Sequence, residues 1–388
     1  MTAAPRRDTT VPVTLEPVVD RATMNRFLTM PWAVQGGDPN WVPPLLFERR
    51  QHLDPRKNPY FENAEVAYWL ATRGTACLGR ISGQVNRAHL QIHKDATGHF
   101  GFLEAVDDPT VFAALLGTME DWLRDRGLRR VVGPFSLSIN DESGLLVEGF
   151  HSRPFIMMGH APPYYGPRLE AQGYRKVKDL IAYAYDLTAE LPPRAAVFMK
   201  EFESRADVTI RPLDMSRYEA DLDIIAEIFN DAWAENWGFL PLTKSDTRHM
   251  AKNLKPLVAP EHVAIASVDG EPAAMAVTLP NVNEAIADLN GRLLPFGWAK
   301  LLWRLKVRTP KSTRLPLMGV RRKYHGSPLG SALALGVVET VRRHHRDLGT
   351  RHCELSWILE DNHRIKHMLN LLGAKPHKTY RLYEKDLT

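Results

Sequence analysis

Two stretches of the chain resemble each other without a gap, and they begin 200 positions apart, at Leu169 and Leu369. LEAQGYRKVKDLIAYAYDL and LNLLGAKPHKTYRLYEKDL share a glycine, a lysine, a tyrosine and a final Asp-Leu pair at matching positions. Two shorter similarities follow in the same order: NWVPPL resembles NWGFLPL, and a strand-like run ending at Asn86 resembles one ending at Asn283. Self-similarity at a domain-sized period indicates that one structural unit is used twice.

The repeat fixes the expected number of domains. A chain of 388 residues is long enough for two domains with their own cores. Pro192 and Pro193 follow a strand-like run and cannot donate backbone hydrogen bonds, so we expect the boundary there. We predict a disordered tail at 1–12, a first domain at 13–190, a linker with a helix at 191–204, and a second domain at 205–388.

The composition is typical of a protein of the cell interior. The two cysteines, Cys77 and Cys353, lie in separate halves within apolar runs, which favours neither a disulfide framework nor a metal cluster. No run approaches about 18 apolar residues, and the N-terminus lacks the apolar core of a signal peptide. We therefore expect a cytoplasmic protein without a metal, either free or on the cytoplasmic face of a membrane.

A basic segment interrupts the second half. The formal net charge is +5, and seven Lys or Arg with no acidic residue lie between Gly291 and Arg314, within an insertion predicted at 290–314. If residues 297–307 are helical, an apolar face and a basic face result. The apolar face consists of Trp298, Leu301, Leu302 and Leu305, and the basic face of Lys300, Arg304 and Arg308.

Three interpretations of this helix are open: an ordinary amphipathic helix packed on the domain, an interfacial helix on an anionic membrane, or a nucleic-acid contact. No zinc finger, RNA-binding motif or basic tail accompanies it, so we expect no nucleic-acid partner. Tryptophan suits the membrane interface. The residues predicted to contact a membrane are Trp298, Lys300, Trp303 and Arg304.

The second half shows strands alternating with helices. A strand at Val208, a helix, and a hairpin turning at Asp269 and Gly270 come first. After the insertion, RLPLMGV, HCELSWIL and HKTYRLYEKDL are strands separated by two helices, each closed by a glycine. We predict an α/β (α+β) fold of two tandem units, each a mixed, mostly antiparallel sheet flanked by helices.

One loop of the second half has the form of a phosphate-binding site. HGSPLG, at His325–Gly330, leads from a strand into a long helix. Backbone N–H groups at such a helix start have no helical partner and, with the helix dipole, bind a pyrophosphate. Pro328 removes one donor, although proline is tolerated in the first turn of a helix.

With this loop, residues 205–388 resemble the GCN5-related N-acetyltransferase (GNAT) superfamily. Asn362 after the next strand and Gly373 before the last strand follow the order of that family, while His325 and Pro328 depart from its loop. The resemblance implies acyl-CoA as co-substrate. The residues implied to bind it are Val320, Arg321, Arg322, His325, Gly326, Ser327, Leu329, Gly330, Ser331 and Asn362.

The first half lacks this loop. Asp107 and Asp108 stand at the corresponding position, and adjacent carboxylates repel a pyrophosphate, so we interpret the first half as a degenerate copy. Its longer stretch SINDESGLLVEGFHSRPFIMMGHAPPYYG is a candidate wall of an acceptor pocket. Phe155, Met157, Met158 and Tyr164 within it suit either an apolar ligand or plain core packing.

The chemistry implied by the resemblance is attack of an amine on the thioester of acyl-CoA, which needs a base, an oxyanion donor and an acid. Family members often place the acid tyrosine seven residues after the asparagine, where this chain has Leu369. The candidates that remain for catalysis are Glu354 and Ser356 on one face of a strand, Tyr380, Tyr383 and Glu284. Tyr383 has a twin at Tyr183, which leaves a structural role as the alternative for Tyr383. The alternative for Glu354 and Ser356 is a pair that faces solvent.

NDAWAENWGFLPL lies where the acceptor-binding helices of the family lie, which implies Asn230, Trp233, Asn236 and Trp237 as acceptor-binding residues. The whole-chain pattern also resembles double-domain bacterial acyltransferases similar to ceramide synthases. We therefore predict an acyl-CoA-dependent N-acyltransferase for a long-chain or sphingoid-type amine. The alternatives are an N-acetyltransferase for a small polar amine or a protein, and a CoA- or lipid-binding module without catalysis.

Overall fold

The computed structural model describes residues 11–388, so positions 1–10 of the predicted tail lie outside the described residues. The N-terminal half contains strands β1 (Thr14–Pro17), β2 (Ala64–Arg73), β3 (Ala76–Asn86), β4 (Thr97–Ala105), β5 (Arg130–Gly133), β6 (Leu145–Glu148) and β7 (Arg175–Asp186). Its helices are α1 (Arg21–Thr29), α2 (Pro31–Gln35), α3 (Leu46–His52), the 3-10 helix η1 (Pro59–Glu62), α4 (Arg87–His93), α5 (Pro109–Arg124) and α6 (Tyr165–Glu170).

The C-terminal half contains strands β8 (Val208–Pro212), β9 (Val263–Val268), β10 (Glu271–Pro280), β11 (Ser312–Val320), β12 (His352–Leu359) and β13 (Lys375–Asp386). Its helices are α7 (Pro193–Glu203), α8 (Tyr218–Ala232), α9 (Lys244–Leu254), α10 (Val282–Ile286), α11 (Gly297–Trp303), α12 (Pro328–Asp347) and α13 (His363–Leu371). Shorter turns are η2 (Met215–Arg217), η3 (Pro260–His262), the π-helix η4 (Arg304–Arg308) and η5 (Arg322–Tyr324).

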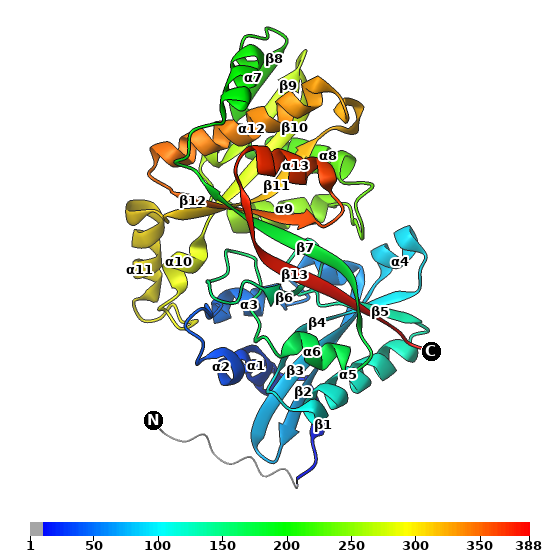
Figure 1. Ribbon diagram of the computed structural model, residues 1–388. Coiled ribbons are helices and arrows are strands. Elements are labelled where there is room, and N and C mark those ends of the chain that lie inside the picture. The colour runs from blue at the N-terminus through cyan, green and yellow to red at the C-terminus, as the bar shows by residue number, and fades with distance from the viewer. Residues whose placement is uncertain (1–10) are drawn as a thin grey trace.

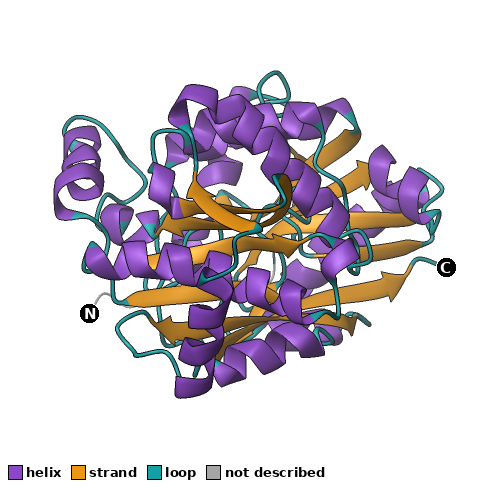
Figure 2. Cartoon of the chain, turned by 90° about the horizontal axis from the view of Figure 1, so that it is seen from above, coloured by secondary structure: helices purple, strands orange, loops and turns teal. Residues whose placement is uncertain are grey.

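All of these strands belong to one sheet. Its order is β1-β2-β3-β4-β5-β13-β7-β12-β11-β10-β9-β8, and β6 pairs with β13 beside this path. The pairs β4–β5 and β11–β12 are parallel, and the other neighbours are antiparallel. Helices lie on both sides of the strands (Figure 2). This arrangement confirms the predicted fold class.

The two halves exchange their final strands. β7 closes the N-terminal half of the sequence but pairs with β12, while β13 pairs with β5, and the two strands pair with each other between the halves (Figure 1). The exchange extends to the cores, because Tyr183 and Tyr185 pack in the C-terminal core and Tyr380 and Leu382 in the N-terminal one. The repeated segments of the sequence are therefore the parts that join the halves.

Alternation of side chains along β9 and β10 gives the C-terminal half two packed faces. Alanines such as Ala264 and Ala276 lie beneath α12, and the larger Ile265 and Met275 pack on the side of α8. In the N-terminal half, α5 packs across β2 and β3. These helices leave the middle of the sheet open for the candidate site, where β12 lies between β11 and the exchanged strand β7.

Candidate active site

A cavity opens where β11 and β12 separate. These parallel strands pair only over Ser312–Leu315 and His352–Leu355; beyond these residues β11 pairs with β10 and β12 with β7. The diverging ends line a cavity of about 2190 Å³ that also reaches residues of the N-terminal half. Small-molecule sites usually measure roughly 300–1,000 Å³, so this cavity has room for two substrates.

The N-terminus of α12 faces one end of this cavity. Ser327 caps the helix, because its Oγ accepts a hydrogen bond of 3.0 Å from the N–H of Gly330. Gly330 is required by the loop itself, since a Cβ there would lie 2.1 Å from the carbonyl oxygen of Tyr324. His325 and Gly326 also line the cavity, which brings the positive end of the helix dipole beside it.

The residues predicted to bind acyl-CoA divide into two groups. Those that line the cavity are Val320, Arg322, His325, Gly326, Gly330, Ser331 and Asn362, whereas Arg321, Ser327 and Leu329 do not. The side chain of Asn362 caps α13 by accepting a hydrogen bond of 3.2 Å from the N–H of Ile365. The loop and Asn362, distant in the sequence, therefore meet at one end of the cavity.

The basic residues of the loop are already paired with carboxylates. Arg321 contacts Glu227 at 3.3 Å, Arg322 contacts Asp231 at 3.3 Å and Glu235 at 3.4 Å, and Lys323 contacts Glu271 at 2.7 Å. Their charge is therefore less available to a phosphate than the sequence alone indicates.

A different arginine, Arg364 of α13, supplies positive charge at the loop. It lines the cavity, and its Nη2 would lie 4.0 Å from a Cβ on Gly326. No ion pair of Arg364 occurs within the described part of the chain. The sequence reasoning missed this residue, whose only signal is its position two residues after Asn362.

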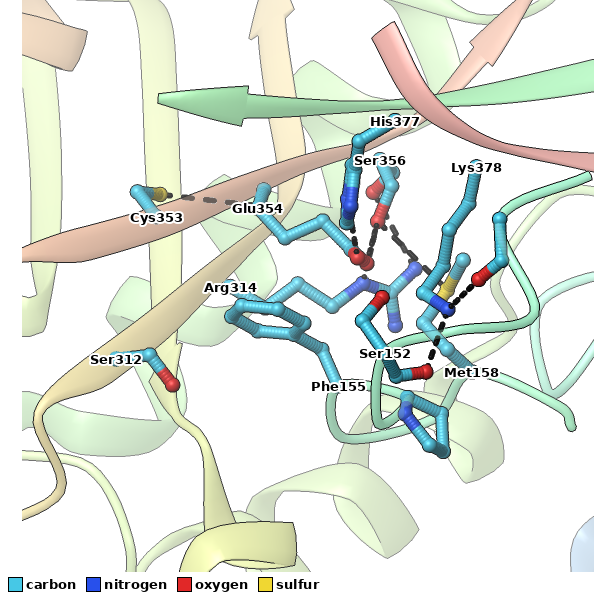
Figure 3. A network of polar contacts seen from close by, with 12 residues as sticks. Ser152, Phe155, Met158, Ser312, Arg314, Cys353, Glu354, Ser356, His377 and Lys378 are labelled. Atoms are coloured by element: carbon cyan, nitrogen blue, oxygen red, sulfur yellow. Dashed lines mark hydrogen bonds and ion pairs between the residues drawn. The ribbon is translucent and has the colours of Figure 1, made fainter. Parts of the chain in front are cut away.

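At the point where the strands separate, three side chains form a buried chain of hydrogen bonds (Figure 3). The Oγ of Ser356 donates to Oε1 of Glu354 at 2.9 Å and accepts from Nε of Arg314 at 2.9 Å. Glu354 is fully buried and does not line the cavity, whereas Ser356 and Arg314 do. The prediction that Glu354 and Ser356 share one face is consistent with this contact, and only Ser356 of the pair reaches the cavity.

Arg314 is a buried cation held by neutral groups. Its Nη1 donates to the carbonyl of Ile156 at 3.0 Å and its Nη2 to that of Ser356 at 3.2 Å, and its guanidinium lies 4.9 Å from the ring centre of Trp357. Burial lowers the pKa of Arg314 to about 10, a fall that the nearby charge of Glu354 limits. A buried cation without a direct carboxylate contact is costly unless the site uses its charge.

The exchanged strand β13 contributes residues next to this hydrogen-bond network. Nε2 of His377 lies 2.9 Å from the second oxygen of Glu354. Tyr380 is fully buried, its hydroxyl has no hydrogen-bond partner among residues 11–388, and burial raises its pKa well above 10. Tyr380 does not line the cavity, so it lies next to the network without reaching the space for a substrate.

The other two predicted catalytic residues lie elsewhere. Glu284 is exposed and holds the start of β11, because its carboxylate accepts hydrogen bonds from the Oγ of Ser312 and from the N–H of Lys311. Tyr383 is buried in the N-terminal core and donates a hydrogen bond of 3.1 Å to Glu170. Neither lines the cavity, and the geometry of Tyr383 matches the structural alternative.

Three of the predicted acceptor-binding residues line the cavity. Trp233 donates from its indole N–H to the carbonyl of Met318 on β11 at 3.0 Å, and Asn236 and Trp237 line the wall nearby. Asn230 does not, because its amide is bonded to the backbone of Leu242. The side chain of Asn230 is therefore a fold-supporting group.

The basic insertion forms a shorter α-helix than expected, since α11 ends at Trp303 and continues as the π-helix η4. Lys300 and Arg304, the two predicted membrane cations, both pair with Asp288, whose single carboxylate offsets one of their two positive charges. Trp298 and Trp303 are exposed. Leu301 and Leu305 instead line the cavity, so the predicted apolar face is divided between solvent and the interior.

The long stretch of the first half does form a wall of the cavity. Residues 134–146 and 156–161 contribute to it, including Met157 and Met158, while Phe155 and Tyr164 lie outside the lining. Within residues 11–388, no group of three or more His, Cys, Asp or Glu is arranged to hold a metal ion. No described helix is long and apolar enough to cross a membrane.

Two known bacterial proteins resemble this chain over nearly its whole length. No family model matches the chain. The bacterial ceramide synthase of Caulobacter vibrioides is 47% identical over 99% of this chain and 100% of its own length. Protein YghO of Escherichia coli is 44% identical over 95% of this chain and 94% of its own length.

Solved structures share the fold at low identity. A tandem GNAT protein from the clavulanic acid biosynthesis pathway has a TM-score of 0.57 at 14% identity, covering 97% of this chain and 99% of its own. A GCN5-related N-acetyltransferase from Sphaerobacter thermophilus has a TM-score of 0.52 at 15% identity, covering 97% of each chain. The chain therefore belongs to the family of the bacterial ceramide synthase, has the tandem GNAT fold and is an N-acyltransferase.

Proposed function

We propose that the protein transfers a fatty acyl group from acyl-CoA to the amine of a long-chain, sphingoid-type acceptor. One observation carries the proposal: a single, mainly apolar cavity of about 2190 Å³ joins the loop before α12 to the N-terminal half and includes Arg314 and Ser356. The relative at 47% identity, named a bacterial ceramide synthase, supports the same substrate class.

The loop end of the cavity suits the CoA portion. The start of α12 offers the helix dipole and backbone N–H groups to a pyrophosphate, and Arg364 adds a cation beside Gly326. We assign the pantetheine arm to the gap between β11 and β12, where backbone groups of the separated strands no longer pair with each other. The thioester then lies near Arg314 and Ser356.

The reaction forms a C–N bond between the acceptor amine and the acyl carbon, and breaks the C–S bond to CoA. Arg314 fits the role of oxyanion donor, because a fixed buried cation stabilises negative charge that develops on the thioester oxygen. Ser356 fits a relay that passes a proton of the amine to Glu354. This proton balances the one that the leaving thiolate acquires.

We also propose that the segment 294–308, here called the docking segment, rests on an anionic membrane. Six of the fourteen large apolar side chains exposed among the described residues lie in it, which makes it the main apolar surface of the described chain. They are Leu294, Phe296, Trp298, Leu302, Trp303 and Val307. Because Leu301 and Leu305 line the cavity from the same segment, a lipid acceptor has a short path inward.

The test is acyl transfer by the purified full chain. We expect an amide product, identified by mass spectrometry, from palmitoyl-CoA with sphinganine, and little product from acetyl-CoA with spermidine. Transfer confined to acetyl-CoA and polar amines would overturn the lipid proposal. Saturable binding of palmitoyl-CoA without transfer to any amine would instead support a binding module.

A further inference from the structure

Charged side chains line the cavity in the N-terminal half, on the side away from the CoA loop. Arg49, Arg80, Glu104 and Glu142 all contribute to its wall, and all come from elements before β6. The proposed chemistry uses none of them. An apolar cavity that keeps such groups needs a reason, because burying charge without full pairing is costly.

Glu142 is held in a rigid loop. The backbone of the loop is fixed by hydrogen bonds from the N–H of Ser136 to the carbonyl of Glu142 and from the N–H of Gly144 to that of Pro134, at 2.8 and 2.9 Å. One carboxylate oxygen of Glu142 accepts from Arg49 at 2.7 Å, whereas the other has no hydrogen bond to the described residues. The side chain therefore has an open acceptor at the cavity.

The charge of Glu142 acts on two arginines that line the same cavity, Arg80 and Arg314. Burial lowers the pKa of both Arg314 and Arg80 to about 10, and the charge of Glu142 works against this fall in each case. Its carboxylate is thus within electrostatic reach of the proposed oxyanion donor and of the charged wall. A cationic amine beside Glu142 would lie in the same cavity as Arg314 and Ser356.

Arg80 is nine-tenths buried and incompletely paired. Its Nη1 donates to the carbonyl of Phe27 at 2.8 Å, but its Nη2 lies 3.9 Å from Glu104, beyond hydrogen-bond distance. Its Nε has no hydrogen-bond partner in the part of the chain that the structure describes. The rings of Phe27 and Phe102 hold its guanidinium at 4.9 and 5.8 Å from their centres. This packing fixes the orientation of the open donors.

Glu104 faces Arg80 and is also short of charge pairing. It accepts hydrogen bonds of 2.8 Å from the hydroxyl of Tyr165 and the amide of Gln35. Burial raises the pKa of Glu104, while Arg80 opposes the rise. Donor and acceptor groups thus stand side by side, which is the pattern that recognises hydroxyl groups, because a hydroxyl both donates and accepts.

We propose that the N-terminal half provides a head-group subsite for a long-chain amino alcohol, in which Glu142 binds the ammonium group and Arg80 with Glu104 bind hydroxyl groups on the adjoining carbons. This inference rests on the proposed acyl transfer. It assigns the N-terminal unit, which lacks the phosphate-binding loop, to the selection of the acceptor. Acyl-CoA and the head group then approach Arg314 from opposite ends of one cavity. The bound ammonium group releases one proton to solvent before its nitrogen attacks, and the second proton follows the Ser356–Glu354 relay to the leaving thiolate.

The test compares two amines with equal chain lengths, sphinganine and octadecylamine, which differ in hydroxyl groups. The full chain, Arg80→Met and Glu142→Gln are assayed with palmitoyl-CoA, with exposed Arg56→Met and Glu219→Gln as controls. We expect Arg80→Met to lower kcat/KM about 10-fold for sphinganine and less than about 2-fold for octadecylamine. We expect Glu142→Gln to raise KM for both amines, with unchanged binding of palmitoyl-CoA.

Equal losses on both amines for Arg80→Met in a folded protein would overturn the hydroxyl assignment, and an unchanged KM in Glu142→Gln would overturn the ammonium assignment. Arg80→Lys, which keeps the charge, covers the case in which the methionine variant does not fold. Binding of the two amines without acyl-CoA, measured by intrinsic fluorescence, gives the same comparison without turnover. A wild-type chain that prefers sphinganine in binding but forms no amide would therefore contradict the proposed function and leave the subsite supported.

Discussion

Arg314 and Glu354 occupy paired positions on β11 and β12, and the hydroxyl of Ser356 lies between their charges. The serine satisfies Nε of the arginine and one oxygen of the carboxylate together. Because pairing of the two strands ends one residue later, at Leu315 and Leu355, this contact stands at the mouth of the gap. The three residues thus place the proposed chemistry next to the last residue pair that joins β11 and β12.

Glu354→Gln should remove the proton acceptor while retaining an oxygen for Ser356. We expect kcat for amide formation to fall by about 10²–10⁴-fold, the usual size of general-base effects, with the Kd of palmitoyl-CoA unchanged. Steady-state kinetics and equilibrium binding measure both quantities. Glu219→Gln is the matched control, because Glu219 is exposed and outside the cavity. Equal effects of the two variants would argue against the relay.

The lowered pKa of Lys378 predicts that the free energy of unfolding depends on pH. Its ammonium donates to the carbonyls of Gly149 and Ser152 at 2.6 and 2.8 Å, and burial lowers its pKa from 10.5 to about 8. Between these values the unfolded chain binds more protons than the folded one, so the lysine's contribution to the free energy of unfolding rises with pH. Relative to Lys378→Met, we expect a rise of about 3 kcal/mol between pH 8 and 10.5.

Chemical denaturation of both proteins across this pH range measures the difference. The methionine variant also lacks two hydrogen bonds, which lowers its free energy of unfolding by the same amount at each pH. This constant loss cancels when each protein is compared with its own value at pH 8. A difference that stays flat, or that falls as the pH rises, would contradict a depressed pKa for Lys378.

The docking segment predicts which cations matter at a membrane. Lys306 and Arg308 are exposed, and neither has an ion pair with the residues that the structure describes, whereas Lys300 is bound to Asp288. We expect Lys306→Gln and Arg308→Gln each to weaken binding to phosphatidylserine-containing vesicles about 5-fold, and Lys300→Gln to weaken it less. Vesicle co-sedimentation at low and high salt measures this order.

The apolar part of the docking segment has its own comparison. Replacing Trp298 and Trp303 by serine should reduce vesicle binding even at high salt, because burial of apolar surface is not screened. Ile92→Ser removes an exposed apolar residue on α4 and should have no such effect. Retained vesicle binding in the double serine variant would show that the membrane contact lies outside this segment.

Gly330→Ala is expected to act through the loop as well as on the ligand. Its Cβ would lie 2.1 Å from the carbonyl oxygen of Tyr324, so the loop must move, lowering Tm and weakening binding of CoA together. Gly117→Ala is the control, because it lies in α5 with no atom near its Cβ position and should stabilise by about 0.5–1 kcal/mol. Weaker CoA binding at an unchanged Tm would mean that the added methyl group affects the ligand and leaves the loop in place.

The repeat in the sequence predicted two related units. The helices and strands of the C-terminal half lie close to where the apolar pattern of that half predicts them. The exchange of β7 and β13 was not predictable in this way. Because the two strands are similar, their local pattern fits either position in the sheet, and only long-range packing of residues such as Tyr183 and Tyr380 distinguishes them.

The residues of the candidate site also differ in whether the sequence alone could identify them. The loop at His325–Gly330 could be found because a strand, a glycine-rich turn and a helix are consecutive in the chain. Arg314 could not, since it heads an apolar strand and its partners at Ile156 and Ser356 are remote in the sequence. Contacts between the two halves produce no local pattern in the sequence, so the sequence alone does not predict them.

The exchanged strands also set an order for biosynthesis. As the chain leaves the ribosome, β5 is complete at Gly133, but the strand that pairs with it begins only at Lys375. Until then Val131 and Val132 have an unpaired edge, which exposes the nascent half to wrong partners and to chaperones. Synthesis of β13 completes the sheet of the N-terminal half, whereas the C-terminal half already has its strands and β7 once β12 ends at Leu359. The half that is synthesised first is therefore the last to be completed.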